Sequence, residues 1–173
     1  MRKRATVYWL LPAKPERELF CEIVRILRKE FRAPNFEPHL TLFSTAKDRQ
    51  SPKKVLKQIA LRQIRLTARG VGFSSEFTRT VFVRFKSSDA LRKLVADFSR
   101  KAKVRAKAPT DPHVTLLYKK LPRAAKKELA AVMKLPFRSV VFDSIAAVRC
   151  ASPSRTKADV QAWKILAKKS LRR

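Results

Sequence analysis

The sequence carries the pentapeptide PHLTL at residues 38–42 and a near copy, PHVTL, at residues 112–116. His39 and His113 are the only histidines of the chain, so both lie in the same context. We predict a strand around each copy, because aromatic and β-branched residues surround it. Residues two apart on a strand face the same side, so each copy presents an imidazole and a threonine hydroxyl to one surface. Packing alone does not explain two such copies, and we interpret both histidines as functional.

The segments around the two copies repeat the same order of elements, strand, helix and strand, at 5–44 and again at 77–119. Hydrophobic periodicity predicts the elements of both copies and the remaining ones. The predicted strands are 5–13, 36–44, 63–75, 77–86, 111–119, 138–151 and, from a weak alternation, 160–171; the predicted helices are 15–31, 51–60, 89–103 and 122–135. The sequence therefore predicts a duplicated α+β fold in one domain over 1–173, with one histidine motif from each half.

The composition is that of a folded but very basic protein. Hydrophobic residues make up 45% of the chain, and the formal net charge is +29. Such a field attracts polyanions, so nucleic acid is the leading partner, although a merely solvated basic surface is the competing interpretation. No apolar run reaches the length of a membrane span, and the N-terminal segment lacks the pattern of a secretory signal. We therefore expect a cytoplasmic protein with no membrane association, and the charge argues for a monomer.

The cysteines and glycines exclude several classes of site. Cys21 and Cys150 belong to no C-x-x-C pair, and no Cys/His cluster has zinc-ligand spacing, so we expect two buried structural thiols. A disulfide between them is unsupported in an intracellular protein. With Gly70 and Gly72 as the only glycines, the P-loop and dinucleotide-binding fingerprints are absent. No carboxylate cluster accompanies the histidines, which argues against a metal-dependent nuclease.

Two imidazoles and two hydroxyls in one cleft suit phosphodiester chemistry without a metal. In-line displacement at phosphorus needs a base at the attacking oxygen and an acid at the leaving oxygen. Histidine serves either role near neutral pH, because its ordinary pKa is about 6.5. Hydroxyls of Thr41 and Thr115 can donate to the non-bridging oxygens of the phosphate. The alternative for the threonines is strand propensity alone.

With its two H-x-T motifs on a repeated βα unit, the chain resembles the 2H phosphoesterase superfamily. One group of this superfamily is the RNA 2′,3′-cyclic phosphodiesterases, once called 2′-5′ RNA ligases. A second group is the plant and yeast cyclic nucleotide phosphodiesterases. The resemblance to the second group is carried by VYWLLPA, NFEPHLTLF, TDPHVTLLY and EFTRTVFVRF, and by Asp159 and Trp163 near the end. It implies a bilobal fold in which two antiparallel sheets form a central cleft, with the helices outside. It also implies hydrolysis of a 2′,3′-cyclic phosphate, on a nucleotide, an RNA 3′ end or ADP-ribose, to the 2′-phosphate.

The same resemblance implies roles for single residues and no cofactor. His113 would activate water, His39 would protonate the leaving oxygen, and Thr41 and Thr115 would bind the phosphate. The plant enzymes carry extra cysteines that this chain lacks, so their redox regulation is not transferred. The charge of +29 exceeds what a small nucleotide requires, which leaves an RNA substrate on the basic surface open.

Several aromatic residues near the motifs are candidates for stacking on a base, although core packing is the more frequent role of each: Tyr8, Trp9, Phe43, Phe77, Phe82 and Tyr118. Tyr8 and Trp9 face opposite sides of the first strand, so at most one lines the cleft. Tyr118 lies five residues after His113 and faces away from it unless a bulge intervenes.

Three charged residues near the second motif have open roles. Arg79 and Arg84 are candidate phosphate contacts, with a solvated surface position as the equal alternative. Asp111 lies two residues before His113, and the sequence does not say whether it orients the imidazole.

Two other functions compete with hydrolysis. One is a basic RNA-binding protein without turnover, which predicts strong salt dependence and indifference to histidine replacement. The other is RNA ligation or 3′-end trimming on the same fold.

Overall fold

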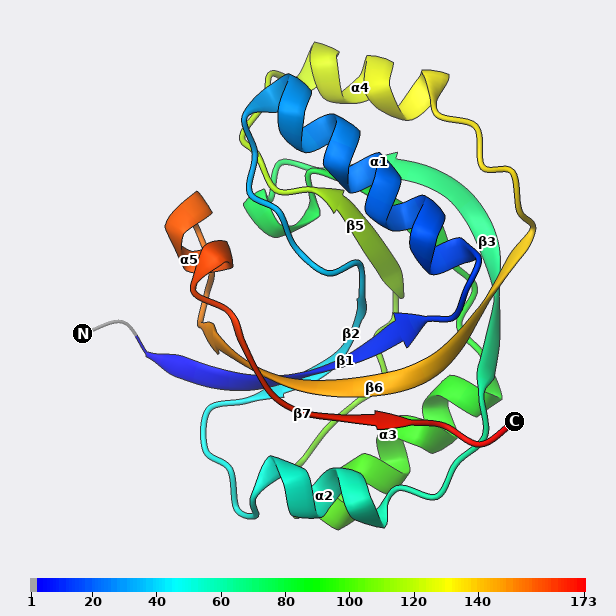
Figure 1. Ribbon diagram of the computed structural model, residues 1–173, viewed down its shortest axis with the longest axis vertical. Helices are drawn as coiled ribbons and strands as arrows, with labels where there is room; N and C mark the ends of the chain where they lie inside the picture. Colours follow the sequence, from blue (N-terminus) through cyan, green and yellow to red (C-terminus); the bar gives the residue numbers. More distant parts are fainter. Residues whose placement is uncertain (1–2) are drawn as a thin grey trace.

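The computed structural model describes residues 3–173, and its chain alternates between strands and helices (Figure 1). The strands are β1 (Arg4–Pro12), β2 (Leu40–Thr45), β3 (Ile64–Phe73), β4 (Val81–Phe85), β5 (His113–Leu117), β6 (Ser139–Ala151) and β7 (Lys164–Ser170). The helices are α1 (Glu16–Phe31), α2 (Pro52–Gln58), α3 (Asp89–Ala102), α4 (Arg123–Val132) and α5 (Lys157–Gln161), with a 3₁₀ turn η1 (Phe77–Arg79). The α+β class is confirmed, and so is the final strand.

The seven strands form one antiparallel sheet in the order β1-β2-β5-β4-β3-β6-β7, and β1 also pairs with β6. The expectation of two separate sheets is corrected here, because strands of the two halves pair at two places. β2 meets β5 at the pair Leu40 and Val114. β6 is 13 residues long, so its first residues pair with β3 while the remainder pairs with β1. The six strands from β1 to β6 thereby close into a ring.

The helices of the two halves exchange places on the sheet. α1 follows β1 in the chain but packs mainly against β5, whereas α4 packs against β3 and β4. α3 follows β4 but sends Phe98 against Tyr8 of β1 and Phe43 of β2, at ring-centroid distances of 5.1 and 5.7 Å. In Figure 1, α1 and α4 accordingly lie at one end of the molecule and α2 and α3 at the other. Each half therefore completes the hydrophobic core of the other.

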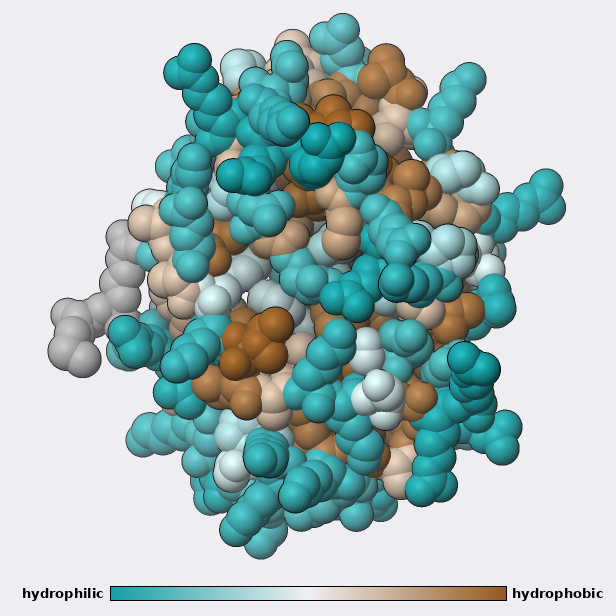
Figure 2. All heavy atoms as spheres, viewed as in Figure 1, coloured by the Kyte–Doolittle hydropathy of each residue, from teal (hydrophilic) through white to brown (hydrophobic). Residues whose placement is uncertain are grey.

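The surface agrees with the composition. Figure 2 shows long hydrophilic side chains over most of the visible face, with smaller hydrophobic areas between them. Cys21 is exposed on α1, which corrects the expectation of a buried thiol, whereas Cys150 is buried as expected; both are free. No helix within residues 3–173 is long and apolar enough to cross a bilayer.

One helix escaped the sequence interpretation, which left 152–159 as a loop. α5 begins after Thr156, whose side chain accepts from the Asp159 amide while Asp159 accepts from the Thr156 amide. This is a capping box, and the T-x-x-D spacing was its signal in the sequence. α5 packs against β6 and lies at the left side of the molecule in Figure 1, and the chain continues from it to Trp163.

Candidate active site

The pairing of β2 with β5 brings the two histidine motifs together. Leu40 and Val114 are direct partners, fully buried on the core side of the sheet. The residues before and after each of them face the opposite side, because side chains alternate along a strand. An antiparallel register through this pair sets His39 opposite Thr115 and Thr41 opposite His113. The pseudo-twofold relation between the halves therefore passes through the site itself.

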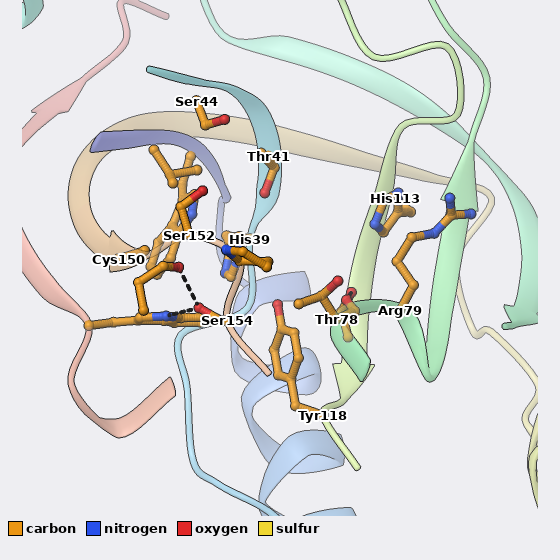
Figure 3. A pocket seen from close by; sticks show the side chains of 16 residues that line it. His39, Thr41, Ser44, Thr78, Arg79, His113, Tyr118, Cys150, Ser152 and Ser154 are labelled. Carbon is orange, nitrogen blue, oxygen red and sulfur yellow. Dashed lines mark hydrogen bonds between the residues drawn. The ribbon is translucent and has the colours of Figure 1, made fainter. Parts of the chain in front are cut away.

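These residues open into a pocket of ≈ 300 Å³. Figure 3 shows His39 and Thr41 on one side of it, His113 and Arg79 on the other, and Tyr118 between them. All four predicted site residues line the pocket, together with Val7, Trp9, Ser44, Thr78, Arg79, Tyr118, Cys150, Ala151, Ser152, Pro153, Ser154 and Trp163. The structure thus joins residues from β1, β2, β5, β6 and the turn before β4.

Both imidazoles are held in the same way. Nδ1 of His39 lies 2.6 Å from the carbonyl oxygen of Glu37, and Nδ1 of His113 lies 2.8 Å from that of Asp111. A carbonyl only accepts, so Nδ1 carries the proton and donates in both rings. In the neutral imidazole Nε2 is then a free base, and in the imidazolium it is an acid. Each ring is fixed in the tautomer that leaves Nε2 for the pocket.

The acidic side chains of the two carbonyl-bearing residues are anchored as well. Arg17 donates to Glu37 at 2.7 Å. Arg79 and Arg84 donate to the two carboxylate oxygens of Asp111 at 2.6 and 3.0 Å. The residue two before each histidine is therefore tied by its side chain to an arginine and by its carbonyl to the imidazole. Asp111 orients His113 through its backbone, which answers the question that the sequence left open.

Arg79 brings a guanidinium to the pocket beside the second histidine. Its Cζ lies 4.6 Å from the ring centroid of Phe82, and that ring lies 5.2 Å from the His113 ring. Its Nε atom is buried and has no hydrogen-bond partner. Its terminal nitrogen is paired with Asp111, so the guanidinium lies between that carboxylate and the pocket that it lines. Arg84 contacts Asp111 but is not a lining residue.

Aromatic rings enclose the first histidine. Trp9 stacks on His39 with ring centroids 3.7 Å apart and planes 10° apart, and Trp163 meets His39 edge-on at 5.7 Å. Tyr8 lies in the core against Phe43, so one residue of the Tyr8–Trp9 pair lines the pocket, as expected. Trp163 was not among the site residues predicted from the sequence.

Tyr118 lies in the pocket, on the side from which strict alternation excludes it. Val81 pairs with Leu117 while Phe82 pairs with Thr115, so the register shifts by one residue on β5. Leu116 and Leu117 are both buried in the core. This bulge returns Tyr118 to the side of the histidines, where its ring meets Trp163 at 5.3 Å.

The pocket hydroxyls differ in their present partners. Thr115 is buried and donates to the carbonyl of Thr78 at 2.9 Å. Thr41 is exposed to the pocket. Ser154 accepts from the Trp163 indole at 3.0 Å and donates to the Ala151 carbonyl, as the dashed lines of Figure 3 show. The loop that contains Ser154 thus fixes the second tryptophan of the site.

Burial governs the protonation of the site. Desolvation lowers the pKa of His39 to about 4, opposed by its bond to the Glu37 carbonyl and assisted by His113. Desolvation also lowers the pKa of His113, with nearby Arg79 assisting and the Asp111 carbonyl opposing. Burial raises the pKa of Cys150 to about 12, so this pocket-lining thiol stays protonated and is no nucleophile. Both imidazoles are therefore neutral at pH 7 in the free protein.

The buried His39 makes folding stability sensitive to acid. The unfolded chain binds a proton at His39 below its ordinary pKa of about 6.5, whereas the folded chain excludes it until about pH 4. Stability present above pH 6.5 is therefore lost as pH falls, by about 3 kcal/mol at pH 4. We expect unfolding experiments from pH 7 to pH 4 to show a shallower loss in the His39→Asn variant, whose amide nitrogen corresponds to the Nδ1 atom that donates to the Glu37 carbonyl. Parallel curves for the two proteins would refute this linkage.

Comparison with known proteins places the chain in a family. The model of the 2′-5′ RNA ligase superfamily matches residues 15–152, and the chain belongs to that superfamily. The 2H phosphoesterase resemblance of the sequence is thereby confirmed. The chain is thus a member of a superfamily of phosphoesterases and RNA ligase-like enzymes. No curated protein matches the sequence.

Solved structures share the fold along their whole length at low identity. A protein described as a phosphoesterase is 16% identical, with a TM-score of 0.61 over 98% of this chain and 99% of its own. The protein TT0787 of Thermus thermophilus is 20% identical, with a TM-score of 0.59 over 97% of this chain and 98% of its own. Escherichia coli LigT complexed with 3′-AMP is 15% identical, with a TM-score of 0.56 over 99% of each chain.

Proposed function

We propose that this protein hydrolyses 2′,3′-cyclic phosphates on a nucleotide, an RNA 3′ end or ADP-ribose to the 2′-phosphomonoester, without a metal ion. The observation that carries the proposal is the matched pair of imidazoles, each held through Nδ1 with Nε2 left for one pocket. A cyclic phosphate offers this pair an attack site and a leaving oxygen on opposite sides of phosphorus. Escherichia coli LigT, which shares the fold, was crystallised with 3′-AMP, and this supports a nucleotide ligand.

In the proposed reaction a water oxygen forms a bond to phosphorus and gives its proton to Nε2 of His113. The bond from phosphorus to the ribose 3′ oxygen breaks, and that oxygen takes a proton from Nε2 of His39. The products are the 2′-phosphomonoester and a free 3′ hydroxyl. The proton then passes from His113 to solvent while His39 is reprotonated, so one water is consumed in total.

The surroundings of the two rings support this division of roles. Desolvation, assisted by the Arg79 guanidinium, lowers the pKa of His113 and favours the neutral form that a base requires. Trp9 lies face to face with His39, and an indole face stabilises a cation above it. Burial disfavours the positive charge of a protonated His39. A phosphate anion bound in the pocket offsets this cost, raises the pKa of His39 and so favours its protonated form.

The phosphate itself has three candidate partners in the pocket. Thr41 and Thr115 offer hydroxyls from opposite strands, and donors at the non-bridging oxygens stabilise charge that builds in the transition state. Thr115 would exchange its bond to the Thr78 carbonyl for one to phosphate. The guanidinium of Arg79 supplies the positive charge next to His113.

The test is a hydrolysis assay in EDTA with 2′,3′-cyclic AMP and with a short RNA that ends in a 2′,3′-cyclic phosphate. We expect both to open to the 2′-phosphate, with no change in rate between EDTA and added Mg²⁺. Release of mononucleotides from the RNA end would instead establish trimming, and joining of ends would establish ligation. Salt-sensitive RNA binding with no opening of either substrate would establish the binding protein.

A further inference from the structure

A second hollow, of ≈ 660 Å³, adjoins the active-site pocket. Ser44 lines both, and in Figure 3 it lies at the edge of the pocket beyond Thr41. Two loops form its walls, the one after β2 and the one after α3. Four of its eight lining residues are cations and none is acidic: Lys47, Arg49, Lys103 and Arg105 line it with Ser44, Thr45, Ala46 and Val104. We call this hollow, with its four cations, the basic groove.

Both walls of the basic groove are ordered by hydrogen bonds. On one wall the Thr45 hydroxyl donates to the Lys47 carbonyl at 2.9 Å and accepts from the Lys47 amide at 3.3 Å. On the other wall Lys103 caps α3 in the left-handed region, and Ser99 bonds the backbone on both sides of Arg105, at Val104 and Ala106. Lys47, Lys103 and Arg105 therefore project from backbone turns held by these hydrogen bonds, which lowers the entropy lost when they hold a ligand.

The one acidic residue of the first loop is occupied elsewhere. The carboxylate of Asp48 accepts from the Thr6 hydroxyl at 2.7 Å and lies 3.7 Å from the Arg149 guanidinium. Asp48 is not among the lining residues of the basic groove. The field in the groove is thus positive. The groove shares Ser44 with the pocket of the two histidines.

We infer that the basic groove binds the backbone phosphates of a single-stranded RNA whose cyclic phosphate end occupies the active-site pocket. This inference rests on the proposed function and narrows its substrate to an oligonucleotide. A 2′,3′-cyclic phosphate requires a ribose, so the strand that carries it is RNA. Its upstream phosphates leave the pocket as evenly spaced negative charges, and the adjoining cations match them. A 2′,3′-cyclic mononucleotide lacks these upstream phosphates.

The experiment compares two variants that each lose four positive charges. The groove variant is K47Q/R49Q/K103Q/R105Q, and the control variant is K53Q/K54Q/K57Q/K168Q on α2 and β7, where the altered side chains are exposed. Each is assayed for kcat/KM on 2′,3′-cyclic AMP and on a decamer RNA ending in a cyclic phosphate, across a salt series. Binding of a decamer with a 3′-phosphate end is measured in parallel by fluorescence anisotropy, which requires no turnover.

We expect the groove variant to lose at least about tenfold in decamer affinity and in kcat/KM at low salt, and to keep the wild-type rate on 2′,3′-cyclic AMP. The slope of log affinity against log salt should fall by about 3, since each lost phosphate contact on a single strand removes about 0.7. The control variant should change decamer binding far less. Equal losses in the two variants, or none in the groove variant, would overturn the inference.

The experiment distinguishes an error in the proposed hydrolysis from an error in the proposed RNA-binding role of the basic groove. If neither substrate is opened, the proposed hydrolysis is wrong, while the anisotropy measurement still decides the groove. If both substrates are opened at rates that the groove variant shares with the wild type, hydrolysis stands and the groove is not the RNA site.

Discussion

Replacement of His113 by alanine is expected to lower kcat for cyclic phosphate opening by about 10²–10⁴-fold, and His39→Ala by a similar factor. The reason is that proton transfer is needed at both the attacking and the leaving oxygen, and the pocket offers one imidazole for each. The two groups act in one transition state, so the double variant should be little worse than either single one. Single-turnover assays in EDTA measure these rates without a contribution from product release.

Loss of folding and loss of chemistry must be separated in this test, because His39 is buried and stacked on Trp9. Circular dichroism and thermal unfolding of each variant at pH 7 report the fold. Binding of the 3′-phosphate decamer should persist in both variants, since the cations of the basic groove are untouched. Full activity in either folded variant would remove that histidine from the mechanism.

The site was largely predictable from the sequence because its chemistry is local. The paired histidines and threonines follow strand alternation: His39, Thr41, His113 and Thr115 do lie on one side of the sheet and line a common pocket. The register that unites them, with Leu40 opposite Val114, is a long-range pairing. Nothing in either pentapeptide specifies its partner strand, and the two sheets that the family resemblance implied are one sheet in the structure.

The features that the sequence missed depend on single-residue irregularities and distant contacts. The bulge on β5 reverses the side on which Tyr118 lies, and no residue type near Leu116 announces it. Arg79 and Asp111, which form an ion pair, are 32 positions apart in the sequence. The sequence alone therefore does not show that this ion pair holds the residue whose carbonyl orients His113. The capping box of α5 is different, because its four-residue signal at Thr156 was present and was overlooked.

The division of acid and base roles is open to a direct chemical test. A leaving oxygen needs a proton in the transition state, whereas a leaving sulfur departs as a stable thiolate and needs none, because thiols have much lower pKa values than alcohols. A 2′,3′-cyclic substrate with sulfur in place of the bridging 3′ oxygen therefore bypasses the general acid. It leaves the demand for a base at the attacking water unchanged.

We expect His39→Ala to recover most of the wild-type rate on the 3′-sulfur substrate while His113→Ala stays about 10²-fold or more below it. His39 would then be the acid, as its stacking on Trp9 favours, and His113 the base that burial and Arg79 keep neutral. The rate of thiol release, followed with a thiol-reactive dye, is the measurement, and the oxygen substrate in the same variants is the control. Recovery in His113→Ala instead would exchange the two roles. Recovery in neither variant would mean that both imidazoles are needed for something other than protonation of the leaving group.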